Sequence, residues 1–136
     1  MSFFKGFESL FSNFAKNEMF DYLKFAMYGT DDKNVVRQKD EALQALFNGI
    51  EEMNKKNYEA AQGWIKNSIG LYDETHDTLR KAFSEFFMGE MYETMKNFTK
   101  AMEYYEKAHE VFKTKASMMA LNVEKKIDTL KKELVK

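Results

Sequence analysis

The sequence contains no cysteine and no proline, and only 6 of its 136 residues are glycine. Without cysteine the chain forms neither disulfides nor thiolate metal sites, which suits a reducing compartment, so we expect a cytoplasmic protein. Without proline, long helices can run uninterrupted. No apolar run approaches the roughly 20 residues that a membrane-spanning helix needs. These absences favour a helical globular protein.

Charge of one sign is also lacking. The 21 Lys and Arg residues nearly balance the 22 Asp and Glu residues, and the formal net charge is −1. A chain with this balance has no general attraction for polyanions, so we expect no nucleic-acid partner. Its apolar fraction of 44% and charged fraction of 32% are those of a folded protein.

Apolar residues recur at three- and four-residue steps along the whole chain, and no segment alternates as a strand does. This period predicts long helices over residues 32–56, 57–72, 79–96 and 98–113, and a last one from residue 115. The polar run DETHD, residues 73–77, predicts a loop, and Asn57 and Asn97 are predicted helix caps. Two shorter helices are expected before Gly29. The prediction is an all-α protein of about seven helices without strands.

The first fourteen residues, MSFFKGFESLFSNF, place six large apolar side chains on one helical face: Phe3, Phe4, Phe7, Leu10, Phe11 and Phe14. Polar residues interrupt the run, so it is not a typical export signal. A membrane-surface anchor formed by residues 1–16 is an alternative, although interfacial helices usually carry more basic residues than Lys5 and Lys16.

Two segments repeat at an offset of 40 positions, FNGIEEMNKKNYEAAQGWI and MGEMYETMKNFTKAMEYY. In each, a glycine precedes an alanine by 12 residues, and an Asn–aromatic pair lies between them. The repeated positions are Gly49, Ala61 and Ile65 in the first segment, and Gly89, Ala101 and Tyr105 in the second.

These segments resemble the tetratricopeptide repeat (TPR), a helix-turn-helix unit of 34 residues. The second segment matches better, through Gly89, Tyr92, Ala101, Tyr105 and Ala108. In the first, Asn48, Glu52 and Ser68 replace the expected residues, and DETHD lies in the additional length. The resemblance implies a TPR-like antiparallel helix-hairpin solenoid. We expect one domain over 1–136, with a helical hairpin (1–31), two repeats (32–75 and 78–114) and a capping helix (115–136).

TPR proteins are interaction scaffolds, so the resemblance implies a non-enzymatic adaptor that binds a protein or peptide segment in a concave groove. The family's groove positions correspond here to Leu43, Leu46, Ile50, Met53, Phe83, Phe86, Glu90 and Glu93. The apolar residues among them fit a buried core equally well. Leu46, Ile50 and Phe87 occupy positions where the chaperone-tail-binding TPR proteins need polar or basic groups. An apolar or amphipathic helical ligand is therefore the better expectation.

The apolar groove positions of the first repeat need a cover, because each such side chain left in water forgoes roughly 1.5 to 3 kcal/mol. We predict that the N-terminal phenylalanines pack on them, in the same chain or in a neighbouring one. The last helix carries a heptad seam with two alternative uses, docking on the second repeat or self-association. The seam residues are Ala116, Ala120, Val123, Ile127, Leu130 and Leu134.

No enzyme or cofactor motif is present: the sequence lacks a phosphate-binding glycine loop, a nucleophile elbow and a pair of histidines on one helix turn. Asp73, Glu74, His76 and Asp77 match no calcium-loop spacing and read as a solvated loop. We therefore expect no catalytic residues, no metal and no cofactor.

Overall fold

The computed structural model describes residues 28–136, which hold five helices and no strand. They are α3 (Lys33–Asn54), α4 (Tyr58–Glu74), α5 (Thr78–Thr94), α6 (Phe98–Lys115) and α7 (Ser117–Leu134). The all-helical prediction is confirmed for this part of the chain. The other two helices of the predicted seven fall in residues 1–27, outside the described residues.

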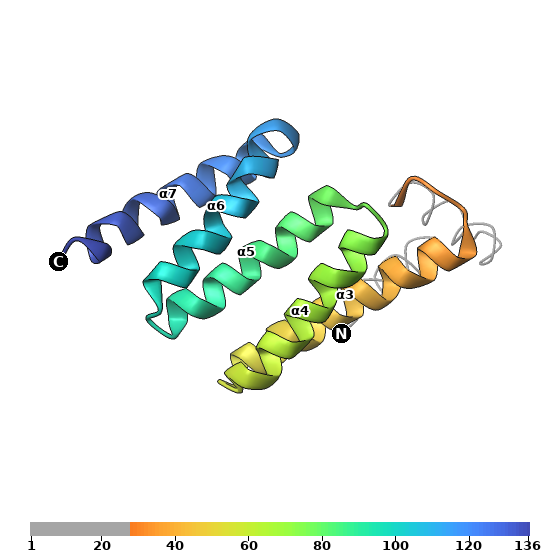
Figure 1. Cartoon of the computed structure of the whole chain (residues 1–136), viewed down its shortest axis with the longest axis horizontal. Helices are drawn as coiled ribbons and strands as arrows, with labels where there is room; N and C mark the ends of the chain where they lie inside the picture. The colour runs from red at the N-terminus through yellow and green to blue at the C-terminus, as the bar shows by residue number, and fades with distance from the viewer. Residues whose placement is uncertain (1–27) are drawn as a thin grey trace, which may run out of the picture. The chain divides into compact units, whose positions relative to one another are not determined.

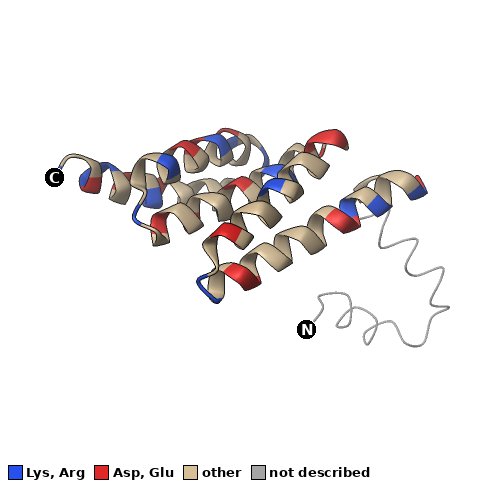
Figure 2. Ribbon diagram, turned by 60° about the horizontal axis from the view of Figure 1, so that its bottom comes forward, with Lys and Arg blue, Asp and Glu red and all other residues tan. Residues whose placement is uncertain are grey.

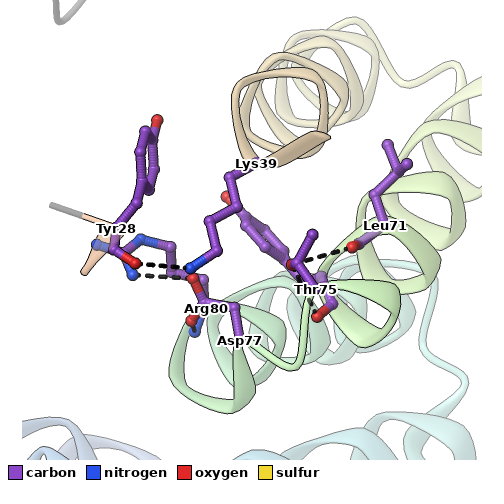
Figure 3. A network of polar contacts seen from close by, with 7 residues as sticks. Tyr28, Lys39, Leu71, Thr75, Asp77 and Arg80 are labelled. Carbon is purple, nitrogen blue, oxygen red and sulfur yellow. Dashed lines mark hydrogen bonds and ion pairs between the residues drawn. The ribbon is translucent and has the colours of Figure 1, made fainter. Parts of the chain in front are cut away.

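The chain divides into two compact units, Met1–Lys39 and Asp40–Lys136. In the described end of the first unit, the Lys39 ammonium donates a hydrogen bond to the Tyr28 carbonyl over 2.9 Å (Figure 3). Asp32 accepts hydrogen bonds from the backbone N–H groups of Asn34 and Val35, and so caps the start of α3. The prediction of one domain over 1–136 stays a prediction.

In the second unit, helices that follow one another in sequence pack side by side, from α4 to α7 (Figure 1). Acidic and basic residues are interspersed along these helices (Figure 2). The shared core is built from one stripe of each helix, with Ile65, Tyr105, Phe112 and Leu130 among its most deeply buried members. This amphipathic pattern is what the helical period of apolar residues predicts.

Glycines allow two pairs of helices to approach closely. A Cβ atom added at Gly49 would lie 2.5 Å from Ile65 Cγ1, and one added at Gly89 would lie 2.7 Å from the Tyr105 ring. Ala61 and Ala101, the small residues of the facing helices, are fully buried. The repeated glycine and alanine therefore mark the contacts of α3 with α4 and of α5 with α6.

The turns after α3, α4 and α5 have the same construction. In each, a residue with positive φ follows the helix (Lys56, His76 and Lys96), and the next residue is the N-cap of the following helix. The N–H of that next residue bonds back to a carbonyl five positions earlier, as from Asn97 to Tyr92 over 2.9 Å. This is the Schellman arrangement of a helix C-terminus. It recurs every 20 residues, at Asn57, Asp77 and Asn97.

The loop prediction for residues 73–77 was wrong in part. Asp73 and Glu74 belong to α4, and only Thr75–Asp77 form the turn. The Asp73 carboxylate pairs with Lys81 over 2.9 Å, and this ion pair links the last turn of α4 to the start of α5. The residues beyond the 34-residue period of TPR units therefore lengthen the helices instead of forming a larger loop.

The cap predictions also had different outcomes. Asn97 caps α6, accepting a hydrogen bond from the Lys100 N–H over 3.3 Å. Asn57 stands at the N-cap of α4 without a capping bond, because its side chain donates to Glu52 over 2.9 Å. Asp77 caps α5 through the Arg80 N–H and also pairs with the Arg80 guanidinium over 2.9 Å (Figure 3).

Candidate functional site

One face of α5 changes from aromatic to acidic along the helix. This face carries residues that lie three or four positions from one another along the helix, which places them on one side: Phe83, Phe86, Phe87, Glu90 and Glu93. The phenylalanines meet α6: the Phe83 and Phe112 rings lie 4.9 Å apart, and the Phe86 and Tyr105 rings lie 5.7 Å apart. Phe86 is buried, whereas Phe83 and Phe87 remain partly exposed. The structure thus divides the predicted groove positions of α5 between core and surface.

The corresponding face of α3 is apolar from residue 43 to residue 53. Leu46 is buried in the core, while Leu43, Ile50 and Met53 are partly exposed. Phe47 is 40% exposed, more than any of the four residues that the sequence placed in a groove. Phe47, one position after the predicted groove residue Leu46, is therefore the most exposed large apolar residue of α3.

The offset of 40 positions relates these two surfaces to each other. It pairs Leu43 with Phe83, Phe47 with Phe87 and Ile50 with Glu90. Because Gly49 and Gly89 both point at the second helix of their pair, residues at equal offsets from them occupy equivalent faces. We call these six residues the docking face: Leu43, Phe47, Ile50, Phe83, Phe87 and Glu90.

At the acidic end of this face, side chains from three helices meet. The Tyr105 hydroxyl of α6 donates a 2.6 Å hydrogen bond to Glu93 of α5. The Lys126 ammonium of α7 lies 3.9 Å from a carboxylate oxygen of both Glu90 and Glu93. It also stands over the rings of Phe86 and Tyr105, 5.9 and 5.8 Å from their centroids. These five residues form the acidic–aromatic cluster: Phe86, Glu90, Glu93, Tyr105 and Lys126.

Partial burial shifts the titration of this cluster. Burial raises the pKa of the Glu90 carboxyl above its ordinary value of 4.5, against the opposing effect of Lys126. Burial, followed by the hydrogen bond to Glu93, also raises the pKa of the Tyr105 hydroxyl. Tyr105 therefore stays a neutral donor over the physiological pH range.

The heptad seam of the last helix is used inside the chain. Ala120, Val123, Ile127 and Leu130 are buried in the second unit, where α7 packs on α6. At the two ends of the seam Ala116 is partly exposed and Leu134 is 44% exposed. The central seam is therefore occupied by the chain's own contacts, as a capping helix requires.

The polar residues 73–77, considered from the sequence as a metal site, lie at the end of α4 and in the turn that follows it. In the turn after α4, the Thr75 hydroxyl donates to the carbonyls of Leu71 and Tyr72, each over 3.2 Å (Figure 3). Among residues 28–136 no group of three or more His, Cys, Asp or Glu side chains could hold a metal ion. Within the same residues, none of the helices has the length and hydropathy needed to cross a membrane.

The predictions for Phe3, Phe4, Phe7, Leu10, Phe11 and Phe14 fall outside the described residues. Both the predicted packing of these side chains and the membrane-anchor alternative for residues 1–16 stay predictions. Deleting residues 1–16 and measuring liposome flotation tests the anchor.

Two features of the site were missed in the sequence. Phe47 could have been found, because the offset of 40 aligns it with Phe87. Lys126 carried no such signal: it is one of several lysines in the last helix, and only the packing of α7 brings it to α5.

Taken together, the described helices and their packing define a helical-repeat protein. The model of the family described as "SNAP: Soluble NSF attachment protein" matches residues 22–135. The chain therefore belongs to the SNAP family. No curated protein and no solved structure matches the chain.

This membership refines the resemblance to TPR proteins. The helical repeat is TPR-like, but the family is SNAP and not TPR itself. SNAP proteins are non-catalytic adaptors, which agrees with the expectation that the chain is not an enzyme.

Proposed function

We propose that this protein is an adaptor that binds an amphipathic helical segment of a partner protein along its docking face. The observation that carries the proposal is the exposure of Phe47, at 40%, between the partly exposed Leu43 and Ile50 on α3. When a partner covers a large apolar side chain at the centre of an apolar stripe, the removal of that side chain from water stabilises the complex. Helical ligands commonly recognise such stripes through apolar residues spaced three and four apart.

The matched family is named for attachment to NSF, so NSF is the first partner to test. Binding of the full chain to purified NSF, and to a fluorescent amphipathic helical peptide, is measured by anisotropy. We expect Phe47→Ala to weaken binding about tenfold or more, since burying a phenylalanine contributes roughly 1.5 to 3 kcal/mol.

Trp64→Ala is the matched control, because Trp64 is 41% exposed, almost the same as Phe47, but lies on α4. It should leave binding unchanged if the docking face carries the interaction. Equal losses in the two variants, or no binding of either ligand, would contradict the proposed function.

A further inference from the structure

The docking face and the acidic–aromatic cluster share Glu90. The charges of this cluster do not balance. Glu90 and Glu93 bring two carboxylates, and Lys126 brings one ammonium. One negative charge remains in a setting that side chains of three helices partly shield from water.

Lys126 fills this cluster loosely. Its two ion-pair distances are both 3.9 Å, whereas a charge-assisted hydrogen bond is about 2.7–2.9 Å long. Glu93 accepts a hydrogen bond from Tyr105, but no described residue donates one to the Glu90 side chain. The Glu90 carboxylate is thus half-buried and still able to accept hydrogen bonds.

The chemistry that the cluster recognises is visible in its present occupant. Carboxylates and the faces of aromatic rings both attract ammonium and guanidinium groups. Lys126 stands over both the Phe86 and the Tyr105 ring within 6 Å of their centroids. The cluster therefore already surrounds one cationic side chain, and its remaining negative charge would attract a second cationic side chain.

The position of Glu90 connects the cluster to the docking face. On α5 it follows Phe83 and Phe87 by seven and three residues, so a helix lying on those rings would reach it with its next turn. We propose that the partner segment carries an arginine or lysine one turn beyond its apolar residues, and that Glu90 and Glu93 receive this side chain. The inference rests on the proposed function and names the chemistry of the partner.

A small cation tests the cluster without any partner protein. Isotope-labelled full-length protein is titrated with N-acetyl-arginine amide while the backbone N–H signals are followed by NMR, with N-acetyl-citrulline amide as the neutral control. We expect saturable shifts at Glu90, Glu93 and Tyr105 with the arginine compound alone. Glu90→Gln should weaken this binding about tenfold, as expected for the loss of a charge-assisted hydrogen bond.

Lys126→Met gives a prediction of the opposite sign. It removes the competing ammonium and keeps an apolar chain over the rings, so the arginine compound should bind several-fold more tightly. Lys125→Met is the matched control, because Lys125 is exposed on the same helix and the variant has the same net charge. The inference would be overturned by equal shifts with the citrulline compound, or by an affinity for the arginine compound that neither Glu90→Gln nor Lys126→Met changes.

Two peptides separate this inference from the proposed function. Both are amphipathic helices with the same leucine face, and one carries arginine where the other carries glutamine, one turn beyond the last leucine. The arginine peptide should bind about tenfold more tightly, and Glu90→Gln should abolish that difference. Equal binding of both peptides would refute the inference while the proposed function stands. Failure of both to bind would refute the two together.

Discussion

At the scale of single residues, three non-glycine residues have a left-handed backbone conformation that glycine would adopt more easily. Lys56, His76 and Lys96 have φ values of 64°, 56° and 62°, and each follows a helix end. In an L-residue the Cβ atom crowds the carbonyl oxygen in this region, whereas glycine has no Cβ. The turns therefore hold their geometry through the two backbone hydrogen bonds of each helix end.

Replacing Lys96 with glycine should stabilise the protein. Relief of the left-handed conformation outweighs the larger entropy that glycine adds to the unfolded chain, so we expect a gain of about 0.5–1 kcal/mol in urea unfolding. Lys100→Gly, in the first turn of α6, is the control and should destabilise by about 1 kcal/mol. A loss of stability in Lys96→Gly would contradict this account.

Glu85 is a buried carboxylate whose ionisation should oppose folding. It is 8% exposed, and burial raises the pKa of its carboxyl above the ordinary 4.5, although Lys81 and Lys107 act in the other direction. Below pH 4.5 the group is protonated in both folded and unfolded chains. As the pH rises, the unfolded chain loses its proton first, so the folded state loses stability until the pH passes the folded pKa, and the lost stability is not recovered above it.

Glu85→Gln removes this penalty and should therefore become relatively more stable as the pH increases. The expected signature is a difference in unfolding free energy between variant and wild type that grows from pH 3.5 to 7.5. Chemical denaturation at each pH measures it. A difference that stays constant or decreases over this range would show that the lysines outweigh burial.

At the scale of helices, the sequence predicts pairs but not all of their contacts. The offset of 40 between Gly49 and Gly89 identifies the two close crossings, since only small residues allow them. The contact of α4 with α5 leaves no such trace. There Ser68 and Ser84 are fully buried with their hydroxyl oxygens 2.8 Å apart. As a replacement of the alanine usual in TPR units, Ser68 alone looked like degeneration, because its partner is identified only by packing.

This hydroxyl pair should contribute as a unit. Ser68→Ala leaves the Ser84 hydroxyl buried without its partner, at an expected cost of about 1–2 kcal/mol. The double variant with Ser84→Ala should lose less than the sum of the single variants, with a coupling of about 1 kcal/mol in a double-mutant cycle. Additive single effects would show that the two hydroxyls do not act together.

The same limit applies to the candidate site. Helical period places Leu43, Leu46, Ile50 and Met53 near one face, but it does not say which of them the next helix covers. The neighbouring helices bury Leu46 and leave Phe47 exposed. Likewise, the charge pattern of the last helix marks a solvated face, and only its packing selects Lys126 for the acidic–aromatic cluster. Burial depends on how two helices pack together, so the pattern of residues along one helix does not predict which side chains are buried.

At the scale of the second unit, each helix from α4 to α7 packs on the next, so stability is passed along the stack through neighbouring pairs. Among the described helices, α7 is the last of this stack and packs on α6. Its buried stripe of Ala120, Val123, Ile127 and Leu130 attaches it to α6, helped by the 2.8 Å contact between His109 and Glu124. The two predicted roles for the seam, capping and self-association, require the same side chains and exclude each other.

The change Leu130→Ala distinguishes these two roles. Leu130 is 1% exposed, and its truncation should cost about 2–5 kcal/mol through lost burial and the cavity left behind. Because the covering atoms belong to the same chain, this loss should be the same at low and high protein concentration. If the seam joined two chains instead, mass action would make the loss depend on concentration. Unfolding curves of wild type and variant over a hundredfold range of concentration, on the order of 1 to 100 µM, therefore decide between an internal cap and an interface.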